Sequence, residues 1–227
     1  MHRRILHVLE GQGDEAVSPQ ADILAYHAMH GQKWDKAVTY YRQAGDRAMA
    51  RSAYPEAVRH YEQALAALEH LPSGPSTMEQ AIDLRLGMLP ALGPSGQFDL
   101  IRRYMQAAEP LAEALDDRPH LGRIFRSLTT TYRFLHDYDR ALSYAQRARE
   151  MTIAHDDVRT QCQTLVYLGQ LHFDLGNYAQ AIQCFSEGLA LPYGDLVYER
   201  RYGPNQASQC LVYMVKCLGE VGHLLKL

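Results

Sequence analysis

Two short segments that lie forty residues apart carry the same pattern, and this register constrains the fold more than any other feature. Tyr138 is followed three positions later by Ala141, and Tyr178 is followed in the same way by Ala181. In both segments the aromatic residue comes after a turn signal, and the small residue opens a stretch of helical periodicity. Similar segments begin at Trp34, Tyr54 and Phe98. A period of this length is typical of repeat architectures, in which each unit buries its apolar face against its neighbours.

Helical periodicity dominates the chain, and the sequence shows no sustained strand alternation. Within residues 123–133, apolar and small side chains fall on one side of a helix, while Arg123, Arg126 and Arg133 fall on the other. Clusters of glycine, proline and aspartate separate such stretches. The predicted helices are 2–10, 20–30, 34–51, 54–71, 76–91, 97–115, 119–135, 138–154, 158–175, 178–190 and 205–221. An irregular bundle of the same helices is the alternative to a repeat array.

The strongest copy of the pattern resembles the tetratricopeptide repeat, which is a pair of antiparallel helices. Its matching residues are Leu165, Leu168, Gly169, His172, Gly176, Tyr178, Ala181, Phe185, Gly188 and Pro192, with His172 where an aromatic residue is usual. The copy before it matches at Phe125, Leu128, Tyr132, Tyr138, Ala141, Ala145 and Ala148. Small residues let two helices approach closely, and large ones fill the remaining space. We therefore expect Gly169, Ala141 and Ala181 to lie at tight helix crossings.

This resemblance extends over about residues 20–227 and implies the fold class. The expected fold is all-α, a tetratricopeptide-like right-handed α-α superhelix of about 10–11 antiparallel helices. Ala37 and Ala57 are only twenty residues apart. Helix 34–51 is therefore predicted to be the second helix of one pair and the first helix of the next.

The two ends of the chain suggest how the domains are organised. Residues 1–19 are expected to be the end of a preceding domain or an N-terminal helix, and residues 20–227 are expected to form the array. The segment from Gly222 to Leu227 resembles the turn after a first helix. Because repeat arrays normally finish with a polar capping helix, this ending predicts that the array is truncated at its C-terminus.

The composition disfavours several classes of function. The chain has 23 basic and 26 acidic residues and a formal net charge of −3, which disfavours direct binding to nucleic acid or to an anionic membrane. No apolar run reaches the roughly 18 residues that a membrane span needs. The N-terminal residues also lack the apolar core of a secretory signal. We therefore expect a cytoplasmic protein.

Cysteines and histidines give no pattern that predicts a metal or a cofactor. Cys162, Cys184, Cys210 and Cys217 form no C-x-x-C pair, and we expect buried, reduced thiols. His27 and His30 are three residues apart on a predicted helix, a spacing that could suit a metal. No third ligand is spaced to join them, so a packing role is expected and no metal site is predicted.

A more specific resemblance is to the C-terminal arrays of large bacterial proteins that join a class III nucleotide cyclase domain, an AAA-type ATPase domain and a tetratricopeptide region. It is carried by residues 25–28, 34–45, 79–86 and 194–200. Related arrays occur in ATP-dependent transcriptional regulators. The resemblance implies a regulatory arm and not the catalytic part, because the chain lacks a G-x-x-x-x-G-K-[S/T] phosphate loop.

These observations predict a non-catalytic module that binds a protein or peptide, within a larger signalling protein. One alternative is the peptide- or small-ligand-sensing arm of a transcriptional regulator. The weaker alternative is a free-standing enzyme. Against it, Ser52, Ser127 and Ser143 have no G-x-S-x-G context.

The resemblance also predicts the binding surface, because the first helix of each tetratricopeptide pair lines a concave groove. The non-core face of helix 119–135 would present Arg123, Arg126 and Arg133. The next first helix would present Gln163, Val166, Gln170 and Phe173, the last as an exposed aromatic ring. Such a groove suits an acidic peptide or a C-terminal carboxylate. Alternatively, the arginines solvate the helix face or pair with carboxylates on neighbouring helices.

Overall fold

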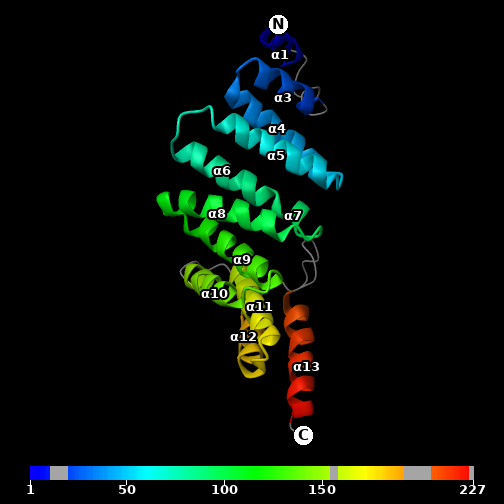
Figure 1. The fold of residues 1–227 in the computed structure, drawn as a ribbon, viewed down its shortest axis with the longest axis vertical. Helices are drawn as coiled ribbons and strands as arrows, with labels where there is room; N and C mark the ends of the chain where they lie inside the picture. The colour runs from blue at the N-terminus through cyan, green and yellow to red at the C-terminus, as the bar shows by residue number, and fades with distance from the viewer. Residues whose placement is uncertain (11–19, 154–157, 192–205, 225–227) are drawn as a thin grey trace. The chain divides into compact units, whose positions relative to one another are not determined.

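The computed structural model describes residues 1–10, 20–153, 158–191 and 206–224, and all of its regular structure in these residues is α-helical (Figure 1). The first helices are α1 (His2–Glu10), α3 (Ala21–His30), α4 (Trp34–Ala50), α5 (Tyr54–Leu68), α6 (Pro75–Gly87), α7 (Leu89–Leu92) and α8 (Phe98–Ala114). They are followed by α9 (Arg118–Phe134), α10 (Tyr138–Ile153), α11 (Val158–Asp174), α12 (Tyr178–Ala190) and α13 (Gln206–Leu224). The expected all-α fold class is confirmed.

One predicted helix, 76–91, is divided into α6 and α7. The break falls at Met88, two residues before Pro90. Proline has no backbone N–H and its ring clashes with the preceding turn, so it is favoured near the start of a helix and often breaks or kinks a helix when it lies inside one. A second difference is at the C-terminus, where Gly222 lies inside α13 and not in a turn.

The chain forms two compact units, Met1–Asp116 and Asp117–Leu227. In the first unit, α1 packs against α3. Arg3 Nε donates a hydrogen bond to the carbonyl oxygen of Gly31 at 2.7 Å, and Lys36 Nζ forms an ion pair with Glu10 at 2.7 Å. The N-terminal helix is therefore joined to the array in this unit by polar contacts as well as by packing.

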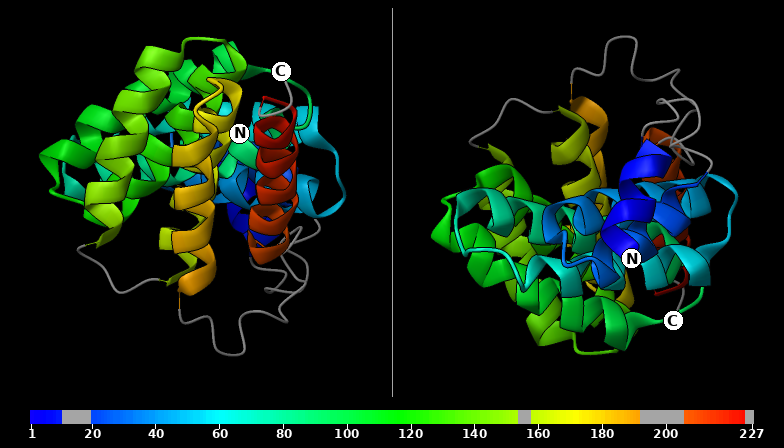
Figure 2. Two further views of the ribbon diagram at one scale, coloured as in Figure 1. Left: turned by 90° about the horizontal axis from the view of Figure 1, so that it is seen from below. Right: turned by 90° about the horizontal axis from the view of Figure 1, so that it is seen from above.

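Helix α4 has the double role that the twenty-residue spacing predicts. It packs against α3 on one side and α5 on the other, and the three helices lie side by side in Figures 1 and 2. Gly45 of α4 faces the ring of Tyr61 of α5, sixteen residues later. In the second unit, Gly169 of α11 faces the ring of Phe185 of α12 with the same spacing. Both crossings combine a glycine with an aromatic ring, as close helix packing requires.

The turns between helices also share one geometry. In six of them the residue two positions before the next helix has a left-handed backbone, with φ between 49° and 73°. These residues are Gln32, Ser52, Gly96, Asp116, His136 and Gly176. In five of these turns, all except the one at Asp116, the following N–H bonds back to a carbonyl five residues earlier, as from Asn177 to His172 at 2.8 Å. This is the hydrogen bond of a Schellman-type helix end, and it fixes the turn that precedes each aromatic residue of the repeat.

The core of the second unit confirms the expected packing. Ala141 and Ala181 are completely buried, and Gly169 lies in contact with a buried aromatic ring. All four cysteines are buried and free, as predicted. Among the described helices, none combines the length and hydropathy needed to cross a membrane.

Candidate functional site

Helices α9 and α11 carry the predicted binding residues, and both belong to the second unit. Helix α9 pairs with α10, helix α11 pairs with α12, and α9 and α11 also touch each other. The start of α9 is fixed by Asp117, whose carboxylate accepts hydrogen bonds from the backbone N–H of His120 at 3.1 Å and from His120 Nδ1 at 2.5 Å. Burial raises the pKa of Asp117, but the hydrogen bonds from His120 outweigh it, and the pKa lies below its usual value.

Arg133 connects the two helices and is held by acceptors of α11. Its Nε and Nη2 donate to the two carboxylate oxygens of Asp174 at 2.5 and 3.3 Å. Its Nη1 donates to Gln170 Oε1 at 3.2 Å. The Arg133 side chain is only 15% exposed. Burial lowers the pKa of Arg133, but Asp174 and Tyr213 of α13 more than compensate and raise it. The alternative role, pairing with a carboxylate on a neighbouring helix, therefore holds for Arg133.

The other two arginines of this face are arranged differently. Arg126 is half-buried and donates from Nη1 to Gln163 Oε1 of α11. Arg123 lies one turn earlier on α9 and is exposed. No hydrogen bond or ion pair of Arg123 is seen within the described residues. On this face, Arg123 is exposed to solvent, Arg126 is hydrogen-bonded to an amide, and Arg133 is ion-paired with a carboxylate.

Two residues of the predicted face lie elsewhere than expected. Phe173 is half-buried and packs against the rings of Tyr178 and Tyr213, with centroids 5.7 and 5.6 Å away. Val166 is 1% exposed and belongs to the core of this unit. Helix α13 covers this part of α11, so the predicted exposed aromatic ring is wrong. Asp174 was not predicted, although it lies one helical turn after Gln170 and shares its face.

The rings of His27 and His30 pack against Tyr26 and against a third histidine that was not predicted. His2 of α1 joins them, with its Nδ1 2.9 Å from Nδ1 of His27 and its ring 5.2 Å from that of His30. A third histidine is therefore close, although the sequence spacing gave no sign of it. Even so, no group of three or more His, Cys, Asp or Glu in the described ranges could hold a metal ion.

Comparisons with known proteins agree with this architecture. Residues 162–191 match the family model for the tetratricopeptide repeat. No curated protein matches the chain. Among solved structures, the chain is similar to BtubC (BKLC) from P. vanneervenii, with 16% identity and a TM-score of 0.70, covering 97% of this chain and 84% of that one.

The chain is also similar to a Rap protein that was crystallised in complex with competence and sporulation factor. Here the identity is 14%, the TM-score is 0.66, and the match covers 99% of this chain and 66% of the Rap protein. The chain thus spans about two thirds of that protein's length. At these identities the likeness shows the fold alone, a tetratricopeptide-like helical repeat.

Proposed function

We propose that this chain is a non-catalytic module that binds an acidic protein or peptide segment through the face formed by α9 and α11. The observation that carries the proposal is the charge of α9. This helix contains four arginines and no acidic residue, and Arg123 and Arg126 lie on one face, a single turn apart. The fold supports the proposal, since helical repeats offer extended surfaces for binding partners. So does the similarity to a Rap protein whose structure was solved in complex with competence and sporulation factor.

The six residues of the predicted site take different roles in this proposal. Arg123, Arg126 and Gln163 make the contacts, because a guanidinium grips a carboxylate through two parallel hydrogen bonds. Arg133 and Gln170 are positioning residues, because Arg133 of α9 donates to both Gln170 and Asp174 of α11 and so holds the two helices together. Phe173 supports the face because its ring packs against Tyr213 of α13.

The wider setting is a proposal that rests on sequence resemblance. In it, the chain is the regulatory arm of a larger bacterial signalling protein that carries cyclase and ATPase domains. The alternative is the sensor arm of an ATP-dependent transcriptional regulator. The sequence encoded beside this chain distinguishes them, because a cyclase domain supports the first and a DNA-binding domain supports the second.

The binding proposal is tested with peptides selected from a displayed library of short Asp- and Glu-rich sequences. The double variant Arg123→Gln/Arg126→Gln removes two charges from the face. The control Arg140→Gln/Arg149→Gln removes the same charge from α10, where both arginines are about half exposed or more. Loss of two charge-assisted hydrogen bonds predicts at least a tenfold weaker affinity for the first variant.

The control is expected to bind like the parent chain, and higher salt should weaken binding of the parent more than that of the double variant. Equal affinities of the two double variants, with intact folds, would contradict the proposed face.

A further inference from the structure

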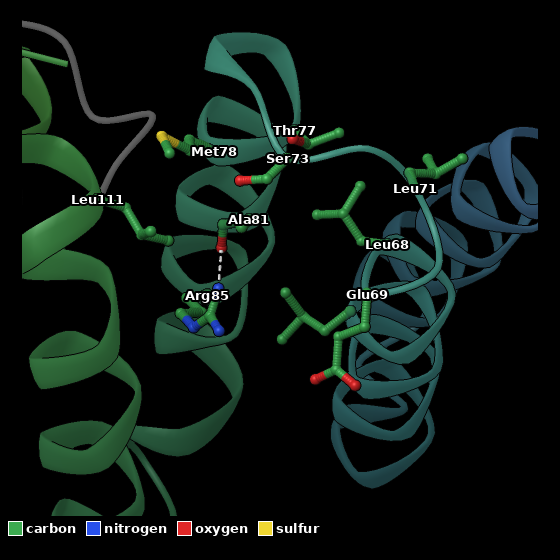
Figure 3. A pocket seen from close by; sticks show the side chains of 10 residues that line it. Leu68, Glu69, Leu71, Ser73, Thr77, Met78, Ala81, Arg85 and Leu111 are labelled. Carbon is green, nitrogen blue, oxygen red and sulfur yellow. Dashed lines mark hydrogen bonds between the residues drawn. The ribbon is translucent and has the colours of Figure 1, made fainter. Parts of the chain in front are cut away.

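An open cavity of about 210 Å³ lies at the surface of the first unit, between α5, α6 and α8 (Figure 3). Six of its ten lining residues are apolar, namely Leu65, Leu68, Leu71, Met78, Ala81 and Leu111, and the other four are Glu69, Ser73, Thr77 and Arg85. Leu71 and Ser73 come from the segment that joins α5 to α6. The cavity is thus built by three helices and one connection of a single compact unit, and it shares no residue with the face on α9 and α11.

Arg85 of α6 brings a positive charge to this wall. Its Nη1 donates to the carbonyl oxygen of Ala81, one turn earlier in the same helix, at 2.9 Å. Its Nε is buried and has no hydrogen-bond partner. Burial lowers the pKa of Arg85, and Glu69 and Tyr104 oppose this effect. An arginine nevertheless stays protonated at physiological pH.

No carboxylate in the described part of the chain forms an ion pair with Arg85. Figure 3 shows Glu69, which follows the last residue of α5, across from the guanidinium on α6. Buried polar groups are normally hydrogen-bonded, and the Arg85 Nε lacks a partner although the residue as a whole is only half-buried. The guanidinium therefore stands beside leucine and methionine side chains in one open cavity, which is the arrangement that an apolar ligand with one anionic end requires.

The remaining polar groups of the wall are less suited to hold a ligand. Thr77 Oγ1 accepts a hydrogen bond from the Gly74 N–H at 2.9 Å and donates to the Gly74 carbonyl at 2.9 Å. Ser73 is exposed at the rim. Arg85 is thus the group that selects the charge of the ligand, and the leucine and methionine side chains select its shape.

We infer that this cavity binds a small free monocarboxylic acid, with its carboxylate on the Arg85 guanidinium and its hydrocarbon part against the leucine and methionine wall. The volume equals that of about seven water molecules in the liquid, which corresponds to a ligand of roughly eight non-hydrogen atoms. A carboxylate on the Arg85 guanidinium would form a charge-assisted hydrogen bond with it. The site is separate from the proposed peptide face and would add ligand binding to the module.

The probe is 4-methylpentanoate, titrated calorimetrically into the whole chain, and the matched control ligand is 4-methylpentanamide, which has the same shape without the charge. We expect saturable binding of the acid, with a Kd at or below about 1 mM, and at least tenfold weaker binding of the amide. Arg85→Gln should remove this preference. The control Arg59→Gln, an exposed arginine of α5, should retain it.

Glu69→Gln gives an opposite and independent prediction, because it removes a negative charge that faces Arg85. It should tighten binding of the acid and leave the affinity for the amide unchanged. This variant tests the inference even if Arg85→Gln does not fold. Three results would overturn the inference: equal binding of acid and amide, no saturable binding at about 10 mM acid, or binding only of a peptide that ends in leucine.

The double variant Arg123→Gln/Arg126→Gln separates this inference from the proposed function. It should bind 4-methylpentanoate like the parent chain, since the cavity and the face lie in different units. Loss of acid binding in that variant would contradict the assignment of the acid to the cavity.

Discussion

Replacing Gly169 with alanine should destabilise the second unit, although alanine is the better helix former. A Cβ atom at this position would lie 2.5, 2.7 and 2.9 Å from the Cε1, Cζ and Cδ1 atoms of Phe185. All three distances are below ordinary van der Waals contact. Phe185 is completely buried, so its ring can move away only by displacing its neighbours or by separating α11 from α12.

The magnitude follows from two opposing effects. Alanine in place of glycine inside a helix stabilises by about 1 kcal/mol. Overpacking a dense crossing costs about 1–3 kcal/mol, and more where the ring cannot move. We expect a net loss of about 1–2 kcal/mol in the free energy of unfolding, measured by urea denaturation.

Gly122→Ala in α9 is the matched control. There the nearest atom to the added Cβ is Met151 Cβ, at 3.7 Å, so the control should gain up to about 1 kcal/mol. The double variant Gly169→Ala/Phe185→Leu should show a coupling of about 0.5–3 kcal/mol, because the smaller side chain makes room for the methyl group. If Gly169→Ala and Gly122→Ala shift stability in the same direction, the argument from the α11–α12 crossing is wrong.

Three further predictions concern the repeat and its turns. Ser52→Gly should stabilise the first unit by about 1 kcal/mol in thermal or urea unfolding, because serine has a left-handed backbone there with φ of 59°. Asp117→Ala should cost about 0.5–2 kcal/mol at neutral pH through loss of the cap on His120. Because the folded-state pKa of Asp117 is lowered, this cost is present above the usual carboxyl pKa of 3.8 and is lost as the pH falls through the folded-state pKa. A cost that stays unchanged at lower pH would refute this prediction. Ala181→Leu should cost about 1–3 kcal/mol by overpacking a fully buried position, and an unchanged denaturation midpoint would show that the repeat register is wrong.

The sequence predicts the helices well because the same local signals recur at each turn. An aromatic residue such as Tyr138 or Tyr178 marks the start of each second helix, and a left-handed residue two positions earlier marks the end of the preceding one. These signals act within a few residues, so they can be recognised without knowledge of the tertiary packing. Only at Pro90, where a local signal interrupts a periodic stretch, is a predicted helix divided.

The candidate site is less well predicted because it depends on how helices are placed beside one another. The pairing of Arg133 with Asp174 requires the relative shift of α9 and α11, and the burial of Phe173 requires α13 to cover α11. The cavity at Arg85 has no sequence signal, since its residues come from three helices in the part of the array where the repeat pattern is weakest. Contacts of this kind are a property of the assembled units.

The most direct test of the binding face follows the arginine side chains by NMR during titration with a selected acidic peptide. The Nε–Hε signals can be assigned by comparison with the Arg→Gln variants. The proposal predicts that the signals of Arg123 and Arg126 shift with saturation, while those of Arg140 and Arg149 on α10 stay in place. A bound peptide that leaves Arg123 and Arg126 unshifted, or that shifts only Arg140 and Arg149, would contradict it.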